Sequence, residues 1–328
     1  MIYFIYKTIL TVLMRSTILV GGQAVIEGVM MRVPGAYATA VRTTEGKIKL
    51  QYNDFQSIIS TSSFFSLPIV RGGIHLYESM KIGYQTLEWS VDVNMPTINK
   101  KNQFLESLVS ILSILFAIGL FFGTPIISAY FIQDYFELPK NDTLTFNIIS
   151  GLVRITLFLS YLFAISFLKD VKRLFEFHGA EHKTVYNFES GKEITIANAK
   201  TFSKEHPRCG TSFVFIVMLV SIVSFACIDA MITNFLDIEL RIINRLLIHI
   251  PCIPLVAGLS YEVLKITARY QKYFIFRMLA YPGLLLQKIT TQTPSDDQLE
   301  VAIAALNSAF KDNLSKFQGK EFNAEAIG

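Results

Sequence analysis

Two of the five histidines of this 328-residue chain stand close together, in the segment His178-Gly179-Ala180-Glu181-His182. On an α-helix, residues four positions apart project from the same face and lie near enough to share a ligand. His178 and His182 would then present two imidazoles to one metal ion, with the carboxylate of Glu181 beside them. Neutral imidazole binds Zn²⁺ well, and a nearby carboxylate can take a proton from water. The spacing therefore predicts a zinc site with Glu181 as the general base.

The order His-x-x-Glu-His also occurs in inverted zinc peptidases, where both histidines bind zinc and the glutamate activates water. Such a site needs a further ligand, and His206 and Cys209 follow His182 by 24 and 27 residues. Glu262 is another candidate, because a carboxylate within an apolar segment is costly and is usually functional. If four histidine and cysteine side chains bind, zinc is enclosed and structural, whereas three ligands and a free Glu181 leave a position for water. The sequence leaves both alternatives open.

A second unusual segment, residues 21–32, interrupts an apolar run with three glycines, Glu27 and Arg32. It lacks the spacing of a dinucleotide loop, and no Walker lysine follows. One interpretation is a tightly turned sheet in which Glu27 and Arg32 pair. The other is a substrate or partner surface that faces the histidine segment. The same two interpretations apply to residues 71–73 and Glu78, and the structural one is favoured there.

The composition indicates a membrane protein. Hydrophobic residues make up 52% of the chain and charged residues 17%, whereas soluble domains carry about 25% charged residues. A net charge of +4 without a dense basic stripe excludes nucleic acid as the partner and suits a protein that lies against a lipid bilayer with anionic headgroups. Three cysteines are too few for a disulfide framework, so Cys209 would act as a reduced thiol.

Four stretches are apolar enough to cross a hydrocarbon core, which takes about 20 residues of helix, and they are 104–132, 144–168, 211–233 and 246–264. A Gly-Thr-Pro sequence at 123–125 predicts a kink in the first. A fifth stretch, 273–287, is shorter and more polar, and we expect it to lie in the membrane interface. Arg154 and Asp229 fall within the spans, and we expect them to pair there.

Lysine and arginine predict the orientation. They number ten in residues 1–103, eight in 169–210 and eight in 265–328. The connections 133–143 and 234–245 hold only Lys140, Arg241 and Arg245. Because positively charged loops stay in the cytoplasm, this distribution predicts that both termini and all three rich segments are cytoplasmic.

The predicted fold is an α-helical integral membrane protein with about four transmembrane helices and a small cytoplasmic α+β domain at residues 16–103. In this domain, residues 17–20 form a short apolar strand, followed by a chain reversal or a close backbone approach at Gly21-Gly22. Alternating residues around 44–46 predict a hairpin, and the apolar spacing in 68–91 predicts a helix.

The predicted transmembrane helices divide the rest of the chain into four segments. Residues 104–168 contain the first two of these helices, and residues 211–264 contain the last two. Between them, residues 169–210 form a cytoplasmic histidine-rich segment that begins as a helix, and residues 265–328 form an interfacial helix and a cytoplasmic C-terminal helix. Ser295 and Gln298 have the spacing of a capping box at the start of that last helix. Residues 1–15 lack the form of a secretory signal and are a candidate spurious extension, of which residues 1–13 would be untranslated if Met14 is the true start.

Five motifs in order resemble the YqhQ-like family of bacterial membrane proteins: GGQAVIEGVMMR at 21–32, IVRGG at 69–73, FHGAEHKTV at 177–185, HPRCGTSF at 206–213 and LLLQKITTQTPSDDQLEVAIAAL at 284–306. The resemblance extends over nearly the whole chain from Ser16 onward. The resemblance implies a multi-pass protein of the bacterial cytoplasmic membrane. Members of this family are often described as metal-dependent enzymes. The resemblance also favours Met14 as the start of the protein. It implies no particular substrate.

Together these patterns predict a zinc-binding membrane protein with hydrolase-like chemistry, of which peptidase-like chemistry is one form, at the cytoplasmic face. His178 and His182 would bind zinc, with His206 or Cys209 completing the site. The substrate would be a membrane-proximal peptide or a lipid-linked group. The alternative is a non-enzymatic scaffold or assembly factor, in which zinc holds the cytoplasmic segment to the helices. A transporter is less favoured, because four spans without an internal repeat provide a poor pathway.

Overall fold

The computed structural model describes residues 20–95, 103–139, 142–206, 209–236, 240–270 and 273–319. Its strands follow one another in a single antiparallel sheet with the order β1-β2-β3-β4, and they are β1 (Gly21–Val25), β2 (Gly28–Val33), β3 (Ala36–Arg42) and β4 (Ile48–Asp54). The turns between them contain Glu27, Gly35 and Gly46, all with positive φ. At two of these turns glycine adopts the left-handed conformation without a steric cost. The predicted hairpin around residues 44–46 is confirmed.

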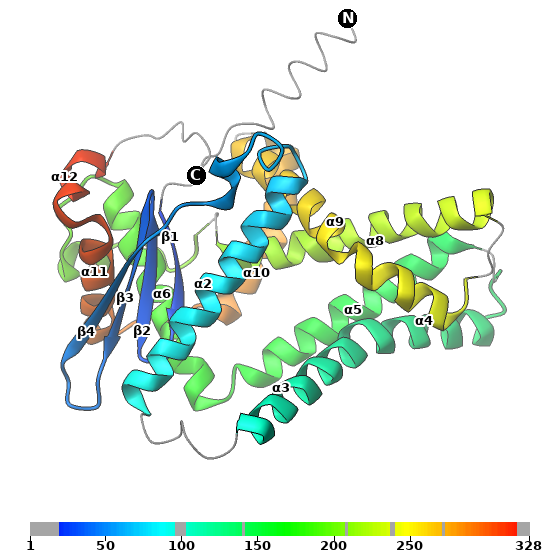
Figure 1. The fold of residues 1–328 in the computed structure, drawn as a ribbon, viewed down its shortest axis with the longest axis horizontal. Coiled ribbons are helices and arrows are strands. Elements are labelled where there is room, and N and C mark those ends of the chain that lie inside the picture. The colour runs from blue at the N-terminus through cyan, green and yellow to red at the C-terminus, as the bar shows by residue number, and fades with distance from the viewer. Residues whose placement is uncertain are drawn as a thin grey trace, which may run out of the picture.

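Helices cover both faces of this sheet, as Figure 1 shows, and they are α2 (Val70–Asn94), α6 (Lys169–Glu189) and α11 (Asp296–Phe310). Successive residues of a strand point to opposite faces. Met31 and Val33 of β2 therefore belong to the core shared with α6 and α11. Met30, which precedes Met31, packs with Ile82 of α2 on the other face. The sheet is thus enclosed by helices from three distant parts of the chain.

The C-terminal helix α11 docks on the sheet through an apolar stripe that includes the fully buried Leu299 and Leu306. The capping box at its start is confirmed: the Ser295 side chain accepts from the Gln298 backbone N–H, and the Gln298 side chain accepts from the Ser295 N–H. A short helix, α12 (Leu314–Phe317), follows it.

Within the described residues, four helices are long and apolar enough to cross a membrane. The first is a composite of α3 (Gln103–Ile118), one π-helical turn, η2 (Gly119–Gly123), and α4 (Thr124–Tyr135), and the others are α5 (Thr143–Ile165), α8 (Gly210–Leu236) and α9 (Ile242–Arg269). The irregular turn lies at the predicted kink, just before Pro125. In Figure 1 these helices extend together to one side of the sheet.

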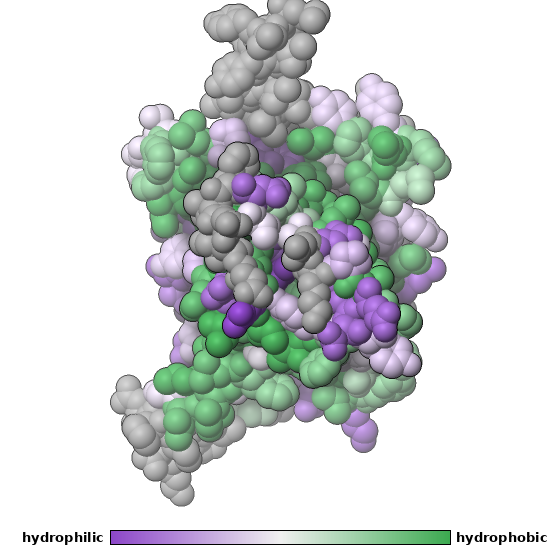
Figure 2. Space-filling view, turned by 90° about the vertical axis from the view of Figure 1, so that its right-hand side faces the viewer, coloured by the Kyte–Doolittle hydropathy of each residue, from purple (hydrophilic) through white to green (hydrophobic). Residues whose placement is uncertain are grey.

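The outer surface of this bundle is apolar. Phe116 and Phe131, for example, are each 72% exposed. Figure 2 looks at the bundle end-on and shows hydrophobic side chains over much of its sides, whereas hydrophilic ones gather near the end that faces the viewer. Helix α10 (Phe274–Thr290) contacts α8 and α9 and leads from the bundle back to the sheet layer.

The polar residues inside the bundle differ from their predicted pairing. Asp229 does not pair with Arg154: its carboxylate is fully buried and accepts hydrogen bonds from Arg245, from Asn147 and from the His249 ring. Arg154 instead donates to the Phe121 carbonyl and the Ser221 hydroxyl. A buried carboxylate needs a positive partner, and for Asp229 of α8 this partner is Arg245 of α9. The sequence did not predict this pair, because the positions of residues along their helices do not show which helices are neighbours.

Two local predictions are also corrected. Gly21 and Gly22 do not reverse the chain, because both lie within β1 and the reversal comes at Glu27. Residues 1–19, which include most of the predicted strand at 17–20, lie outside the described part of the chain.

Candidate metal centre

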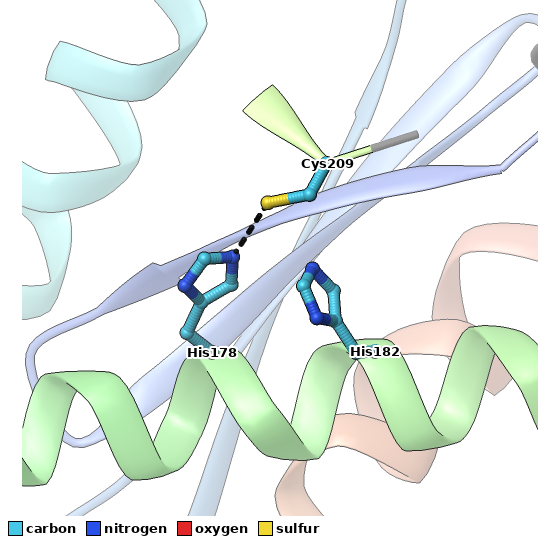
Figure 3. A group of neighbouring side chains, drawn as sticks. All are labelled: His178, His182 and Cys209. Atoms are coloured by element: carbon cyan, nitrogen blue, oxygen red, sulfur yellow. Dashed lines mark hydrogen bonds between the residues drawn. The ribbon is translucent and has the colours of Figure 1, made fainter. Parts of the chain in front are cut away.

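The two histidines of the His-x-x-Glu-His segment project from one face of α6, with ring centroids 4.5 Å apart. Cys209, just before α8, faces them, and its Sγ lies 3.1 Å from Nε2 of His178 (Figure 3). One ligand atom from each of His178, His182 and Cys209 lies within 4.8 Å of the other two. The structure therefore brings together three of the predicted ligands, from two segments of the chain.

Backbone carbonyl groups orient both imidazoles. Nδ1 of His178 lies 2.8 Å from the Thr290 oxygen, and Nδ1 of His182 lies 2.5 Å from the Lys204 oxygen. A carbonyl oxygen only accepts hydrogen bonds, so each neutral ring must carry its proton on Nδ1. The lone pair of each ring is then on Nε2. Metal-binding histidines characteristically donate their other ring N–H to a carbonyl or carboxylate group in this way.

Glu181 is buried on the sheet-facing side of α6, and its Oε2 lies 3.4 Å from Nε2 of His182. Gly22 of β1 makes room for it: a Cβ atom at position 22 would lie 2.6 Å from Cγ of Glu181. The close backbone approach predicted for this glycine pair therefore occurs at Gly22. Burial raises the pKa of Glu181, and the neighbouring His178 and His206 oppose that shift. Its pKa is thus moved toward the range in which a carboxylate exchanges protons with water effectively.

His206 lies next to this group without being part of it. Its ring centroid is 5.7 Å from that of His182 and 4.4 Å from that of Tyr186, and its Nε2 lies 3.5 Å from Oε2 of Glu189. Its backbone N–H and C=O both bond to the Gln287 side chain. Burial lowers the pKa of the His206 imidazole. Among the described residues, the fourth predicted ligand is therefore held beside the cluster by α10 and α6.

The further candidate residues lie elsewhere. Glu262 accepts two hydrogen bonds from Arg71, at 2.7 and 2.6 Å, so both of its carboxylate oxygens are engaged by Arg71. Glu27 pairs with Arg173 of α6, so the predicted pair of Glu27 with Arg32 is wrong. These partners come from helices far along the chain, which local spacing does not reveal.

A cavity of about 520 Å³ adjoins the cluster. Its wall includes the ligand residues, Glu181, and the starts of β1 and α8, and it also includes Arg32, His75 and Tyr261. The cluster of His178, His182 and Cys209 therefore has open space beside it, and this space is large enough for a small substrate.

Sequence reasoning missed the groups that hold this site in place. The Thr290 and Lys204 carbonyls have no side-chain signature, so no residue pattern could have identified them. Gln287 did carry a signal, because it is a polar residue at the end of an otherwise apolar stretch. It is fully buried and anchors the segment that contains His206.

The chain is similar to a known protein family and to a curated protein, neither of which has an assigned function. Residues 67–312 match a family described as "Protein of unknown function (DUF1385)". Over 310 residues the chain is 31% identical to the "Uncharacterized protein YqhQ" of Bacillus subtilis (strain 168), a similarity that covers 89% of this chain and 92% of that protein. No solved structure matches the chain.

Proposed function

We propose that this chain, which belongs to the family described as "Protein of unknown function (DUF1385)", is a zinc-dependent hydrolase that works at a membrane surface. Its family membership agrees with its similarity to YqhQ of Bacillus subtilis. The observation that carries the proposal is the convergence of His178, His182 and Cys209 at the wall of a cavity of about 520 Å³.

The donor atoms favour zinc. Two imidazole nitrogens and one thiolate sulfur form a borderline-soft set of the kind that binds Zn²⁺ in catalytic sites with three protein ligands. The carbonyl groups hold the proton of each ring on Nδ1, so the Nε2 atoms, of which that of His178 contacts Cys209 Sγ, carry the lone pairs that would bind the ion. Zinc in such a site supplies a polarised water molecule as the nucleophile.

Glu181 would accept the proton of that water and pass it to the leaving group. Its carboxylate lies beside His182 and is excluded from bulk solvent. Because burial raises its pKa, it would release the proton less readily than an exposed carboxylate and could return it to the product. Gly22 leaves room for this carboxylate, whose Oε2 lies 3.4 Å from Nε2 of His182.

We further propose that the four apolar helices span the bacterial cytoplasmic membrane with both termini in the cytoplasm. The lysine and arginine distribution supports this orientation. The cavity includes Gly210 and Thr211 at the start of α8 and Tyr261 toward the end of α9. It would therefore lie at the cytoplasmic membrane surface, where a membrane-proximal peptide or a lipid-linked group is within reach.

A structural zinc is the second candidate, and the position of His206 favours it. A modest movement of a ring 5.7 Å from His182 would supply a fourth ligand and close the site. The ion would then hold α6 to the start of α8 in a membrane scaffold or assembly factor.

The substitution Glu181→Gln separates the two functions. A catalytic base should be lost without loss of zinc, so hydrolysis of a panel of fluorogenic peptides and esters should fall by about 100-fold or more. Glu193→Gln, an exposed carboxylate in the turn after α6, is the matched control. Unchanged hydrolysis in Glu181→Gln, or none in the wild type, would reject the enzymatic proposal.

A further inference from the structure

Arg32 is part of the wall of the cavity that also contains the histidine cluster. This residue lies in β2 opposite Gly21 of β1, and its guanidinium lies 4.3 Å from the centre of the Phe55 ring. Both Arg32 and Gly21 line the cavity. A Cβ atom at Gly21 would meet nothing within 4 Å, so the position opposite Arg32 in the neighbouring strand leaves open space.

The guanidinium of Arg32 has unused donors. In the part of the chain that the structure describes, its Nε and Nη2 are buried and have no hydrogen-bond partner. The carboxylate of Glu78 is 3.8 Å from Nη2, beyond hydrogen-bonding distance. Glu78 is already engaged, because it accepts from the Ser57 hydroxyl at 2.9 and 3.0 Å and from the Ile58 N–H at 2.6 Å.

The neighbouring Arg71 shows what such donors bind. It uses the same two nitrogens, Nε and Nη2, to bind both oxygens of Glu262. A guanidinium edge of this kind matches two oxygens of one oxyanion. In Arg71 this edge is filled by a carboxylate of the protein, whereas in Arg32, a residue of the cavity wall, the same two nitrogens have no hydrogen-bond partner among the described residues.

The electrostatic surroundings also favour an anion. His75, which lines the cavity next to Arg32, has its pKa lowered to about 4 by burial, and then by the charges of Arg32, Lys265 and Arg71. The imidazole is therefore neutral at physiological pH, and Arg32, Lys265 and Arg71 lie near enough to act on it, with the Glu78 carboxylate 3.9 Å from its Nδ1. Arg32 has only the distant ion pair with Glu78, and burying its two donors without a hydrogen bond is costly unless a ligand compensates them.

We propose that this part of the cavity, with Arg32 as its main donor, binds a phosphate group of the substrate while the bond to be broken lies at the histidine–cysteine cluster. The proposal rests on the hydrolase proposed above and narrows its substrate to a phosphorylated compound. At a membrane surface the abundant oxyanion is the phosphate of lipid headgroups, and a soluble phosphate ester is the other source.

The test uses the full-length protein in dodecyl maltoside at fixed ionic strength, titrated with inorganic phosphate and with dihexanoyl phosphatidic acid by calorimetry. Wild-type protein should bind both ligands, and Arg32→Gln should bind them at least about tenfold more weakly. Arg42→Gln is the matched control, because Arg42 pairs with Glu300 on the outer part of the sheet. Tighter binding of the phosphatidic acid identifies a lipid source, and equal binding identifies a soluble ester.

Equal affinities of the wild type and Arg32→Gln, or no binding by either, would overturn the inference. His182→Ala separates it from the hydrolase proposal, because that variant should lose zinc and still bind phosphate through Arg32. If the wild type contained no zinc but bound phosphate in an Arg32-dependent manner, the hydrolase would be rejected and the phosphate site would stand.

Discussion

Gly22 of β1 and Glu181 of α6 are so close that a methyl group at position 22 would lie 2.6 Å from Cγ of Glu181 and 2.7 Å from the Met30 carbonyl oxygen. The absence of a side chain in the edge strand is thus what allows the carboxylate to lie beside the histidines. This contact joins the glycine-rich segment and the His-x-x-Glu-His segment, which are far apart in the sequence.

Gly22→Ala should therefore displace Glu181 and strain the sheet. We expect a loss of about 1–3 kcal/mol in the free energy of unfolding, as for other overpacked sites, and a loss of hydrolysis with zinc retained. Gly21→Ala is the control, because its Cβ would meet nothing within 4 Å. Thermal unfolding followed by tryptophan fluorescence measures the difference, and equal midpoints for the two variants would show that the contact is relaxed without cost.

Asp229 should be essential to the bundle because it compensates Arg245, which is 2% exposed. Replacing it with leucine leaves this cation buried without its carboxylate, at a cost of about 3–5 kcal/mol. The double variant Asp229→Leu/Arg245→Met should recover much of that stability, because no charge is then left unpaired. Unfolding in detergent checks both, and additive losses in the double variant would argue against the pair.

His75 should contribute to the pH dependence of stability. Its folded-state pKa of about 4 is below the usual 6.5, so between these values the unfolded chain binds more protons than the folded one. Stability then rises with pH across that window and is lost as pH falls from 6.5 toward 4, by at most about 3 kcal/mol. His75→Gln should flatten the curve of unfolding midpoint against pH relative to wild type. Parallel curves would contradict the shift.

The proposed orientation can be checked at Ser190, which is exposed at the end of α6. Ser190→Cys, in a background with Cys227→Ala and Cys252→Ala, should resist a membrane-impermeant maleimide in intact cells and react after the membrane is opened. Position 135, exposed at the far end of the first apolar helix, is the control and should react from outside as Tyr135→Cys. Labelling of Ser190→Cys in intact cells would reverse the orientation.

Features set by neighbouring residues were predictable from the sequence. The capping box at Ser295 and Gln298, the hairpin around Gly46 and the shared face of His178 and His182 all depend on spacing within one element. The four apolar helices were equally clear, because their length and composition are local properties.

Partners supplied by tertiary packing were not predictable. Glu262 and Arg71 are 191 positions apart, and nothing in either segment indicates that they meet. Asp229 was paired with the wrong arginine because helix depth gives no information on which helices are neighbours. Cys209 and His206 were equivalent candidates in the sequence, and only the fold places Cys209 in the cluster and His206 beside it.

The central claim is that His178, His182 and Cys209 hold one zinc ion with a position left open. The most direct test is the zinc content of protein purified with a histidine-free tag, measured by plasma mass spectrometry for the wild type, His182→Ala, Cys209→Ser and His206→Ala. We predict about one zinc per chain in the wild type and in His206→Ala, and almost none in the other two, because three ligands suffice for an open site. Negligible zinc in the wild type would contradict the metal centre, and loss of zinc in His206→Ala would contradict the open position.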